Sequence, residues 1–536
     1  MFTIIAAASE SVTVDQPLEE SSSLLSQLLL ALLAIIATLI IIATLKVLQM
    51  RQKIKHIPGT WQYFYSLFRI PFIAPYLYFG PTDKMLELMD KIGDSETKTT
   101  SLSMINENSV WISDKDMIKE LTITKASDFE KPKDFFDAIN IFGENLASVQ
   151  SENWKRHFKV CNPGFSPKNL EYVCKVAAQS SDLLFNEWKK VIEKDGKVVL
   201  QVTDYSDLTL DVLGKAGFGF DFGIFTSDET GKKFRAALEY TITYGIAVRG
   251  FILPASKFLY NIVANYTGLT DYCDFMAKIL NNVIETRRKE IKEREQDPNA
   301  NDKRGDVPCD ILSLLVEANM TENALSDGEL MSNSFILALA GHETTSTLLQ
   351  WVSYEISKRP EILKKLQQEV DEKLQGRDPT YDDFPKLDYV NGVIMEILRV
   401  HPPVSTVIKV VSKKSTKIGK FDIPKGTIVR AFMEHTHYRE DYWKDPYTFN
   451  PDRFGDFESR EKIQHTFMWL PFSSGNRKCI GYRFSLMEGC IILAKLVQHY
   501  DFSLLNDEKV DPVTTRTLSV NRPSPNMKVA ITPRVK

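Results

Sequence analysis

The chain has 536 residues, of which 43% are hydrophobic and 25% charged, a composition typical of globular proteins. Its formal net charge of −4 excludes the broad positive field that attracts nucleic acid, so no nucleic-acid partner is expected. The six cysteines are scattered, without a C-x-x-C pair, and predict no disulfide framework. We therefore expect the body of the protein to face a reducing compartment.

The N-terminal region carries a long apolar run. Residues 24–45 are dominated by Leu, Ile and Ala, and as a helix they would span about 33 Å, enough to cross the hydrocarbon core of a membrane. Acidic residues precede the run, and four basic residues follow it closely. The positive-inside rule therefore predicts a short lumenal tail at 1–23, a transmembrane anchor at 24–45, a basic, proline-containing hinge at 46–60 and a cytosolic body at 61–536. A cleaved signal peptide is the alternative, but the run is too long and lacks a positive n-region.

The body is predicted to be mainly helical with a small β portion. Ser326 and Glu329 form a capping box at the start of a long helix. A hairpin is expected from residues 101–104 and 109–112, and strands are expected at 417–421 and 427–433. Helices are predicted to begin at Trp154 and to cover residues 169–192, 204–222, 326–358, 360–376, 390–400 and 486–500.

One cysteine, Cys479, lies in the closely patterned stretch PFSSGNRKCIGYRFSLME at residues 471–488. Gly475 and Gly481 flank it and allow the backbone to come close to a ligand, and Phe472 could cover the sulfur. The two basic residues directly before Cys479 favour the thiolate, as does the N-terminus of the helix expected after it.

The spacing F-x-x-G-x-R-x-C-x-G from Phe472 to Gly481 resembles the haem-binding signature of the cytochrome P-450 superfamily, the haem-thiolate monooxygenases. The resemblance extends from about residue 58 to the C-terminus and is tightest over 325–488. It implies the fold of that family and a haem b cofactor whose iron, the metal of the site, is bound by Cys479. It assigns the surrounding loop to cofactor binding through Phe472, Gly475, Arg477 and Gly481.

A second pattern, A-G-H-E-T-T, begins at Ala340 in the long predicted helix. The small residues Ala340 and Gly341 let a flat ring approach the helix, and a threonine hydroxyl can bond back to the i−4 carbonyl and loosen it. Glu343 and Thr344 provide an acid and an alcohol for proton delivery. The resemblance implies that these two are catalytic and that Ala340 and Gly341 contact the cofactor. His342 stands at a variable position and is expected to be structural.

A third pattern, E-x-x-R, is formed by Glu396 and Arg399. Such pairs are common on helix surfaces, but here the motifs RVHPP and FNPDRF follow in the chain. The resemblance makes Glu396, Arg399 and Arg453 a buried structural ion triad behind the haem. An unpaired buried charge is costly, so the three should pair with one another.

Haem propionates require cations or hydrogen-bond donors. The resemblance suggests Trp154, Lys409 and Arg477 for this role. The family's W-x-x-x-R motif fails, because Phe158 stands where arginine is expected. Its neighbours Arg156, His157 and Lys159 are candidates to compensate, although their helical phase differs.

The resemblance also names four stretches that should line a substrate pocket, at 135–142, 335–340, 404–407 and 517–519. None of these stretches contains Arg or Lys, which favours a neutral steroid- or terpenoid-like ring system over a fatty acid. The pocket residues predicted in this way are Phe135, Phe142, Phe335, Leu339, Val404, Val407 and Leu518.

The predicted activity is hydroxylation of an apolar substrate with O₂ at the endoplasmic reticulum membrane. The chain carries no flavin domain and no dinucleotide-binding G-x-G-x-x-G after a strand. Electrons are therefore expected from an NADPH-dependent flavoprotein reductase. Two alternatives are a haem-thiolate isomerase or dehydratase that acts on peroxides, and a non-catalytic haem sensor. Both would leave the acid–alcohol pair without a use.

Overall fold

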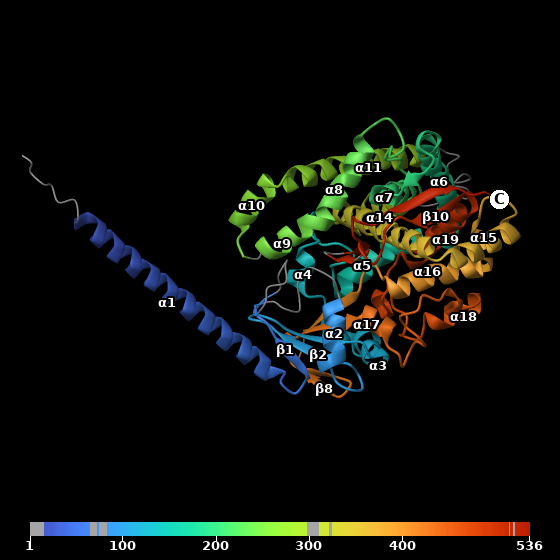
Figure 1. The fold of residues 1–536 in the computed structure, drawn as a ribbon. Coiled ribbons are helices and arrows are strands. Elements are labelled where there is room, and N and C mark those ends of the chain that lie inside the picture. The colour runs from blue at the N-terminus through green and yellow to red at the C-terminus, as the bar shows by residue number, and fades with distance from the viewer. Residues whose placement is uncertain are drawn as a thin grey trace, which may run out of the picture.

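The computed structural model shows one helical body with a small strand-rich side, from which the N-terminal helix α1 projects as a rod (Figure 1). It describes residues 16–64, 72–73, 83–253, 255–296, 310–320, 324–412, 414–513, 515–517 and 520–535. The predicted class, mainly α with a small β portion, is confirmed.

The helices surround one long central member, α14. The main helices are α1 (Gln16–Lys53), α2 (Asp83–Ile92), α3 (Lys115–Lys119), α4 (Lys133–Asp137), α5 (Ser151–Cys161), α6 (Pro167–Asp195), α7 (Val202–Val212), α8 (Thr230–Tyr240), α9 (Ile246–Ile252), α10 (Lys257–Tyr266), α11 (Leu269–Glu295), α13 (Ile311–Met320), α14 (Asp327–Lys358), α15 (Pro360–Leu374), α16 (Asp388–Val400), α17 (Met433–Tyr438), α18 (Phe457–Ile463) and α19 (Tyr482–His499).

Within the described residues the strands form four small sheets, the largest in the order β1-β2-β3-β9-β6-β4. The others pair β10 with β13 and β5, β11 with β12, and β7 with β8. The strands are β1 (Gly59–Trp61), β2 (Thr100–Ser103), β3 (Asn108–Ile112), β4 (Phe129–Glu130), β5 (Val198–Val199), β6 (Thr406–Val411), β7 (Thr416–Ile418), β8 (Phe421–Ile423), β9 (Ile428–Phe432), β10 (Tyr500–Leu504), β11 (Thr515–Thr517), β12 (Asn521–Pro523) and β13 (Val529–Pro533).

Most predicted elements are found in the structure, with differences in where they end: the helix expected at 204–222 is α7 to Val212 and continues as a π-helical segment only to Gly217. The hairpin is confirmed, with Ser101 opposite Val110 in an antiparallel pair. The capping box is confirmed, because Ser326 accepts a bond from the Glu329 N–H and the Glu329 carboxylate accepts one from the Ser326 N–H. The single strand expected at 417–421 is instead divided between β7 and β8 by a turn at residues 419–420, where Gly419 adopts a φ of +53°.

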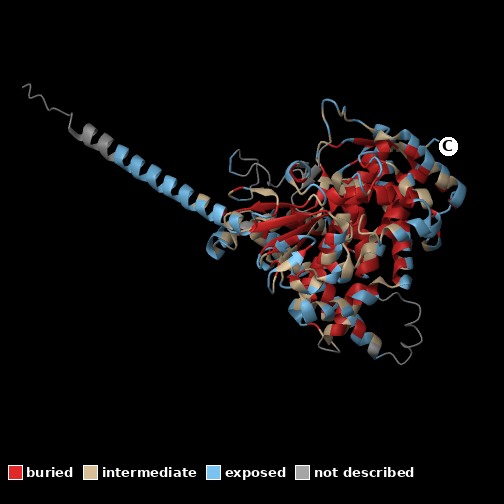
Figure 2. Ribbon diagram, turned by 90° about the horizontal axis from the view of Figure 1, so that it is seen from below, coloured by how far each residue is buried: buried red, intermediate tan, exposed pale blue. Residues whose placement is uncertain are grey.

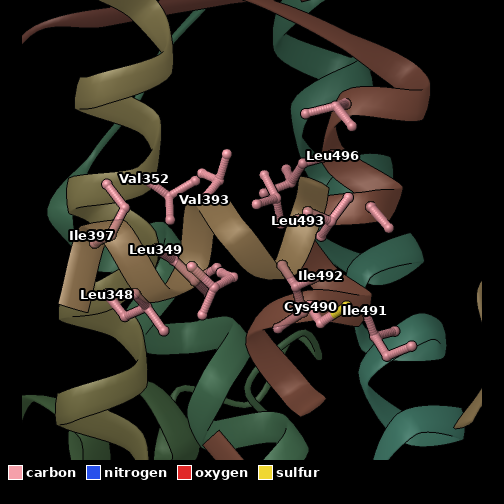
Figure 3. Close-up of a cluster of buried hydrophobic side chains, with 14 of the residues drawn as sticks. Leu348, Leu349, Val352, Val393, Ile397, Cys490, Ile491, Ile492, Leu493 and Leu496 are labelled. Atoms are coloured by element: carbon pink, nitrogen blue, oxygen red, sulfur yellow. The ribbon is translucent and has the colours of Figure 1, made fainter. Parts of the chain in front are cut away.

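The largest core packs α14 against α16, α19 and α6. Figure 3 shows Leu348 and Leu349 of α14 beside Val393 of α16 and Leu493 of α19, all with side chains closed to solvent. Burying such side chains stabilises the fold by roughly 1.5–3 kcal/mol each. This core fixes the position of α14, which contains the A-G-H-E-T-T motif, relative to α19, which directly follows the cysteine motif.

The rod α1 is exposed along its apolar part and packed at its base (Figure 2). The described stretch from Ser26 to Lys53 is long and apolar enough to cross a membrane. The helix does not end at residue 45 as expected but continues to Lys53. The segment predicted to be a hinge is fixed to the body, because Val47, Ile54 and Ile57 are fully buried and Arg51 donates to the Ser101 hydroxyl at 2.8 Å.

Candidate active site

The cysteine loop, residues 471–481, joins the end of the α18 region to α19 and packs closely on the body. The Cys479 N–H donates to the Phe472 carbonyl at 2.9 Å. Gly475 adopts a φ of +70°, and a Cβ at this position would lie 2.3 Å from the Thr122 carbonyl oxygen. The loop therefore requires glycine here for both its backbone angle and its packing. The Thr122 and Ser474 hydroxyls bond at 2.9 Å and fasten the loop at the adjacent residue.

The Cys479 side chain lies deep in the fold, yet it keeps open surface. Burial raises the pKa of its thiol, while the Gly481 N–H and the Lys478 ammonium act in the opposite direction. Arg477, which was expected to favour the thiolate, instead donates to the Val149 carbonyl at 2.6 Å. A cysteine that is surrounded by the fold and still keeps accessible surface is available to a ligand, and a bound metal ion would hold it as the thiolate.

One face of α14 is open although most of the helix is buried. Ala340 is exposed, and Leu337, Gly341 and Thr344 keep part of their surface. Their spacing of three, four and seven residues places them on one helix face, which we call the open stripe. The Thr344 hydroxyl donates to the Ala340 carbonyl at 2.9 Å, the back-bond that locally loosens a helix.

A contact between α14 and α19 brings the open stripe near the cysteine loop. The Thr345 hydroxyl, next to Thr344 in the chain, donates to the Ser485 hydroxyl at 3.0 Å. Ser485 lies in the first turns of α19, which begins just after Cys479. The structure thus gathers the two predicted motifs, more than 130 residues apart in sequence, in one region of the fold.

Glu343 points away from the open stripe. Its side chain is 2% exposed, and its Oε1 pairs with the Arg522 Nη2 of β12 at 2.8 Å. Its Oε2 lies 3.8 Å from the His342 Nε2. Burial raises the pKa of Glu343, and the Arg522 charge opposes that rise. Successive residues of a helix do not face each other, so the carboxyl must turn about its side-chain bonds to approach Thr344.

Three cations, Lys131, Lys409 and Arg477, gather close to the cysteine loop. Burial, followed by the charge of Arg477, lowers the pKa of Lys409 to about 8, and burial lowers the pKa of Arg477 to about 10. Burial and the other two cations lower the pKa of Lys131 well below its usual value. No carboxylate pairs with these three in the described part of the chain. Such a group of buried like charges is suited to an anionic ligand.

The cytochrome P450 family model matches residues 66–531 of the chain. The chain belongs to the cytochrome P450 family. It is 27% identical over 433 residues to cytochrome P450 3A2 of Rattus norvegicus, covering 79% of this chain and 82% of the relative. It is 28% identical over 411 residues to cytochrome P450 3A7 of Homo sapiens, covering 74% of this chain and 78% of the relative.

This P450 is therefore a monooxygenase, an oxidoreductase that uses haem b, and its residues fit that cofactor. The open Cys479 sulfur would bind the iron, and the open stripe of α14 leaves room for a flat ring. Lys131, Lys409 and Arg477 would meet the propionates, and the Trp154 ring lies 4.7 Å from the Arg477 guanidinium. When bound, haem supplies the activation of O₂, to which a thiolate ligand contributes electron density.

The replacement of the family's arginine by Phe158 is not offset by its chain neighbours. Arg156 and His157 both turn to Glu329, with distances of 2.5 and 3.2 Å between the paired atoms, and Lys159 is exposed. The Phe158 ring packs on Trp154 with centroids 5.0 Å apart. Lys131, which the sequence did not single out, lies close enough to Arg477 and Lys409 for their charges to help lower its pKa.

The ion triad comes together at the end of α16. Arg399 donates through Nε and Nη2 to the two Glu396 oxygens at 2.7 and 2.8 Å, and both side chains are closed to solvent. Arg399 also donates to the His437 and Pro446 carbonyls at 2.9 and 2.8 Å. Arg453 is the outer member, with its Nε 3.4 Å from the Glu396 Oε1.

The predicted pocket residues are only partly placed on open surface. Phe335 and Leu339 are closed in the core, whereas Ala340, the third residue expected on that helix face, is exposed and its neighbour Leu337 is partly open. Val404 and Phe135 are exposed, Val407 is half-buried in β6, and Leu518 lies outside the described residues. The Phe142 ring packs edge-on against Phe335 at 5.1 Å and links the 135–142 stretch to α14.

Two site residues were missed by sequence reasoning. Lys131 lies in a short FEKPKD loop with no distinctive pattern, and Arg522 lies in a short strand 179 positions after Glu343. No local spacing connects either residue to a motif. The departure from W-x-x-x-R at Phe158 gave a reason to look for another cation but did not point to Lys131.

Proposed function

We propose that this P450 hydroxylates an apolar small molecule with one atom of O₂, using electrons from an NADPH-dependent flavoprotein reductase. The observation that supports this proposal is the open Cys479 sulfur near the open stripe of α14, where Thr344 presents a hydroxyl. A buried space with a thiolate ligand, apolar walls and one alcohol suits oxygen chemistry on a substrate that water does not surround.

In this proposal Thr344 and Glu343 divide the handling of protons. The Thr344 hydroxyl accepts a proton from the Glu343 carboxyl and donates its own proton into the space beside the open stripe. Glu343 is the acid that restores that proton after its carboxyl has turned from Arg522 towards Thr344. The isomerase and sensor alternatives leave this arrangement without a use.

In this proposal α1 anchors the enzyme in the endoplasmic reticulum membrane, with the body in the cytosol. The apolar stretch of α1 is followed by Lys46, Arg51 and Lys53, all on the side of the body. The positive-inside rule therefore assigns the body to the cytosol and the short N-terminal tail to the lumen.

The reductase is proposed to dock on the cysteine side of the haem site. Lys155 and Lys159 lie on α5, and Lys478 lies in the cysteine loop. Arg483 lies in the first turn of α19. Lys478 and Arg483 both lie over the Tyr482 ring, at 3.7 and 5.7 Å from its centroid. These basic side chains suit an acidic flavin domain, and the association should weaken as salt is added.

The substrate is proposed to be a neutral, steroid- or terpenoid-like ring system, with a fatty acid as the second candidate. The open stripe includes the apolar residues Leu337 and Ala340, and the half-buried Val407 lies in the predicted pocket stretch 404–407. The nearby cations belong to the propionate group, and Arg249 is bonded to the carbonyls of Asp137 and Asn140 at 2.9 and 3.0 Å. A free carboxylate on the substrate would therefore find no available cation among these groups.

The test is NADPH consumption by the reconstituted enzyme with reductase, comparing wild type, Thr344→Ala and Thr344→Ser. We expect Thr344→Ala to bind haem and substrate but to divert electrons into hydrogen peroxide, whereas Thr344→Ser retains much of the product yield. An unchanged product-to-NADPH ratio in Thr344→Ala would exclude the alcohol role. Conversion of a peroxide substrate without reductase would favour the isomerase alternative. Ligand binding without NADPH turnover would favour the sensor.

A further inference from the structure

A row of alternating acids and arginines leads from the protein surface to Glu343. Asp207 of α7 pairs with Arg235 of α8 at 2.6 Å, and Arg235 pairs with Glu239 at 3.1 Å. Arg522 then lies between two carboxyls, 3.3 Å from the Glu239 Oε1 and 2.8 Å from the Glu343 Oε1. We call these five residues the carboxyl ladder.

The carboxyl ladder has one more acid than base. Its three carboxyls face two guanidinium groups. The charge of Lys232 also acts on Asp207 at the outer end, so the shortage of cations falls on Glu239 and Glu343, which share Arg522. Burial is greatest at Glu343, which is 2% exposed, whereas Glu239 is 31% exposed and open to water. The surplus proton is therefore held most easily at Glu343, because desolvation penalises the ionised form most strongly there.

His342 completes the surroundings of Glu343 without adding a charge. Its Nδ1 donates to the Ala338 carbonyl at 2.9 Å, which leaves the Nε2 lone pair facing the Glu343 Oε2. Burial lowers the pKa of His342 to about 4, so the ring is neutral near pH 7. The charged groups that face Glu343 are then Arg522 from β12 and Arg235 and Glu239 from α8.

We propose that Arg522 is a positioning residue whose charge is shared between Glu239 and Glu343, so that solvent-exposed Glu239 controls the proton held by the buried acid. The proposal rests on the proposed role of Glu343 in proton delivery. When Glu239 is ionised it competes for Arg522, and Glu343 retains its proton. When water protonates Glu239, Arg522 turns fully to Glu343, which releases one proton as its O–H bond breaks. The outer carboxyl gains one proton and the inner one loses one, so the charge of the carboxyl ladder is unchanged.

Two substitutions should move Glu343 in opposite directions. Arg522→Met removes the shared cation and favours protonated Glu343, whereas Glu239→Gln removes the competitor and favours ionised Glu343. Each change should alter the ratio of protonated to ionised Glu343 at a fixed pH by about tenfold, the effect of one nearby charge. Arg522→Lys keeps the cation and should stay close to wild type.

The experiment is an infrared pH titration of the carboxyl stretch in the full-length resting ferric enzyme, with Glu343→Gln identifying the band. Glu285→Gln is the matched control, because it removes an α11 carboxylate that is 64% exposed and lies outside the carboxyl ladder. The reduced carbon monoxide spectrum verifies that each variant retains its haem site. The solvent isotope effect on turnover is measured in parallel.

Opposite displacements of the titration midpoint, upward in Arg522→Met and downward in Glu239→Gln, support the proposal. Displacements in the same direction, or equal to that of Glu285→Gln, overturn it. If Glu343→Gln impairs turnover while Arg522→Met and Glu239→Gln both titrate as wild type, the coupling between Glu239 and Glu343 is refuted but the proposed role of Glu343 in proton delivery stands. If Glu343→Gln changes neither the product yield nor the isotope effect, the proposed role of Glu343 fails and the coupling fails with it.

Discussion

Removal of Glu396 should destabilise the protein far more than removal of Arg453, although both belong to the same ion triad. In Glu396→Ala the Arg399 guanidinium, closed to solvent, loses both partners of its bidentate pair. An uncompensated buried charge costs about 3–5 kcal/mol, a large part of the stability of a typical domain. The Asn450 N–H, which donates to the Glu396 Oε1 at 2.8 Å, also loses its acceptor.

In Arg453→Ala the inner pair remains complete, because Glu396 still accepts from Arg399 and from the Asn450 N–H. Arg453 is 11% exposed, and its other bonds go to carbonyls at the edge of the protein, including those of Asp445 and Thr448 at 2.6 and 3.1 Å. Water can replace it there, so the loss should be about 1–2 kcal/mol.

The measurement is urea denaturation of the detergent-solubilised full-length protein, followed by tryptophan fluorescence and haem absorbance. Trp443 is a suitable reporter, because its ring lies 5.4 Å from the Arg399 guanidinium. The midpoint should fall at least twice as far in Glu396→Ala as in Arg453→Ala. Equal displacements in the two variants would refute the reasoning from burial.

Three further predictions concern the ligand, the anchor and the electron donor. Cys479→Ala should abolish the thiolate-type spectrum of the reduced carbon monoxide complex, and an unchanged spectrum would exclude Cys479 as the ligand. Deletion of residues 1–43 should release much of the protein from membranes and leave the haem site intact. Deletion of residues 1–55 should in addition lower the free energy of unfolding by roughly 3–6 kcal/mol, because it removes two fully buried side chains. Equal stability of the two deletion variants would contradict the packed base of α1. Charge reversal at Lys155 and Arg483 should slow reduction by the reductase, most strongly at low salt, and unchanged kinetics would remove this surface from consideration.

The features that the sequence predicted correctly depend on short-range patterns. The Ser326 capping box needs four consecutive residues, and the hairpin at 101–112 needs only its own alternation and turn. The cysteine loop is similar, because Gly475 is required by a local φ of +70°. Such features are encoded where they act, so they can be recognised without knowing the fold.

The features that the sequence did not predict depend on tertiary contacts between segments that are far apart in the chain. Helix α14 is apolar on several sides, so its pattern could not show that Leu337 rather than Phe335 has open surface. Arg522 reaches Glu343 through the placement of a short strand, and Lys131 joins two other cations from separate elements. The extent of α1 beyond residue 45 likewise depends on the contacts of the helix with β1 and β2.

The packed base of α1 has a mechanical consequence for an enzyme that works at a membrane. Because the base of α1 is packed against the body, we expect the helix and the body to rotate together as one rigid unit. The apolar stretch of α1 has no polar face, so a bilayer would fix the depth of the helix but not its rotation about its own axis. The body should therefore rotate as one unit in the plane of the membrane. A partner anchored in the same membrane can then reach the basic surface of the body by diffusion in two dimensions.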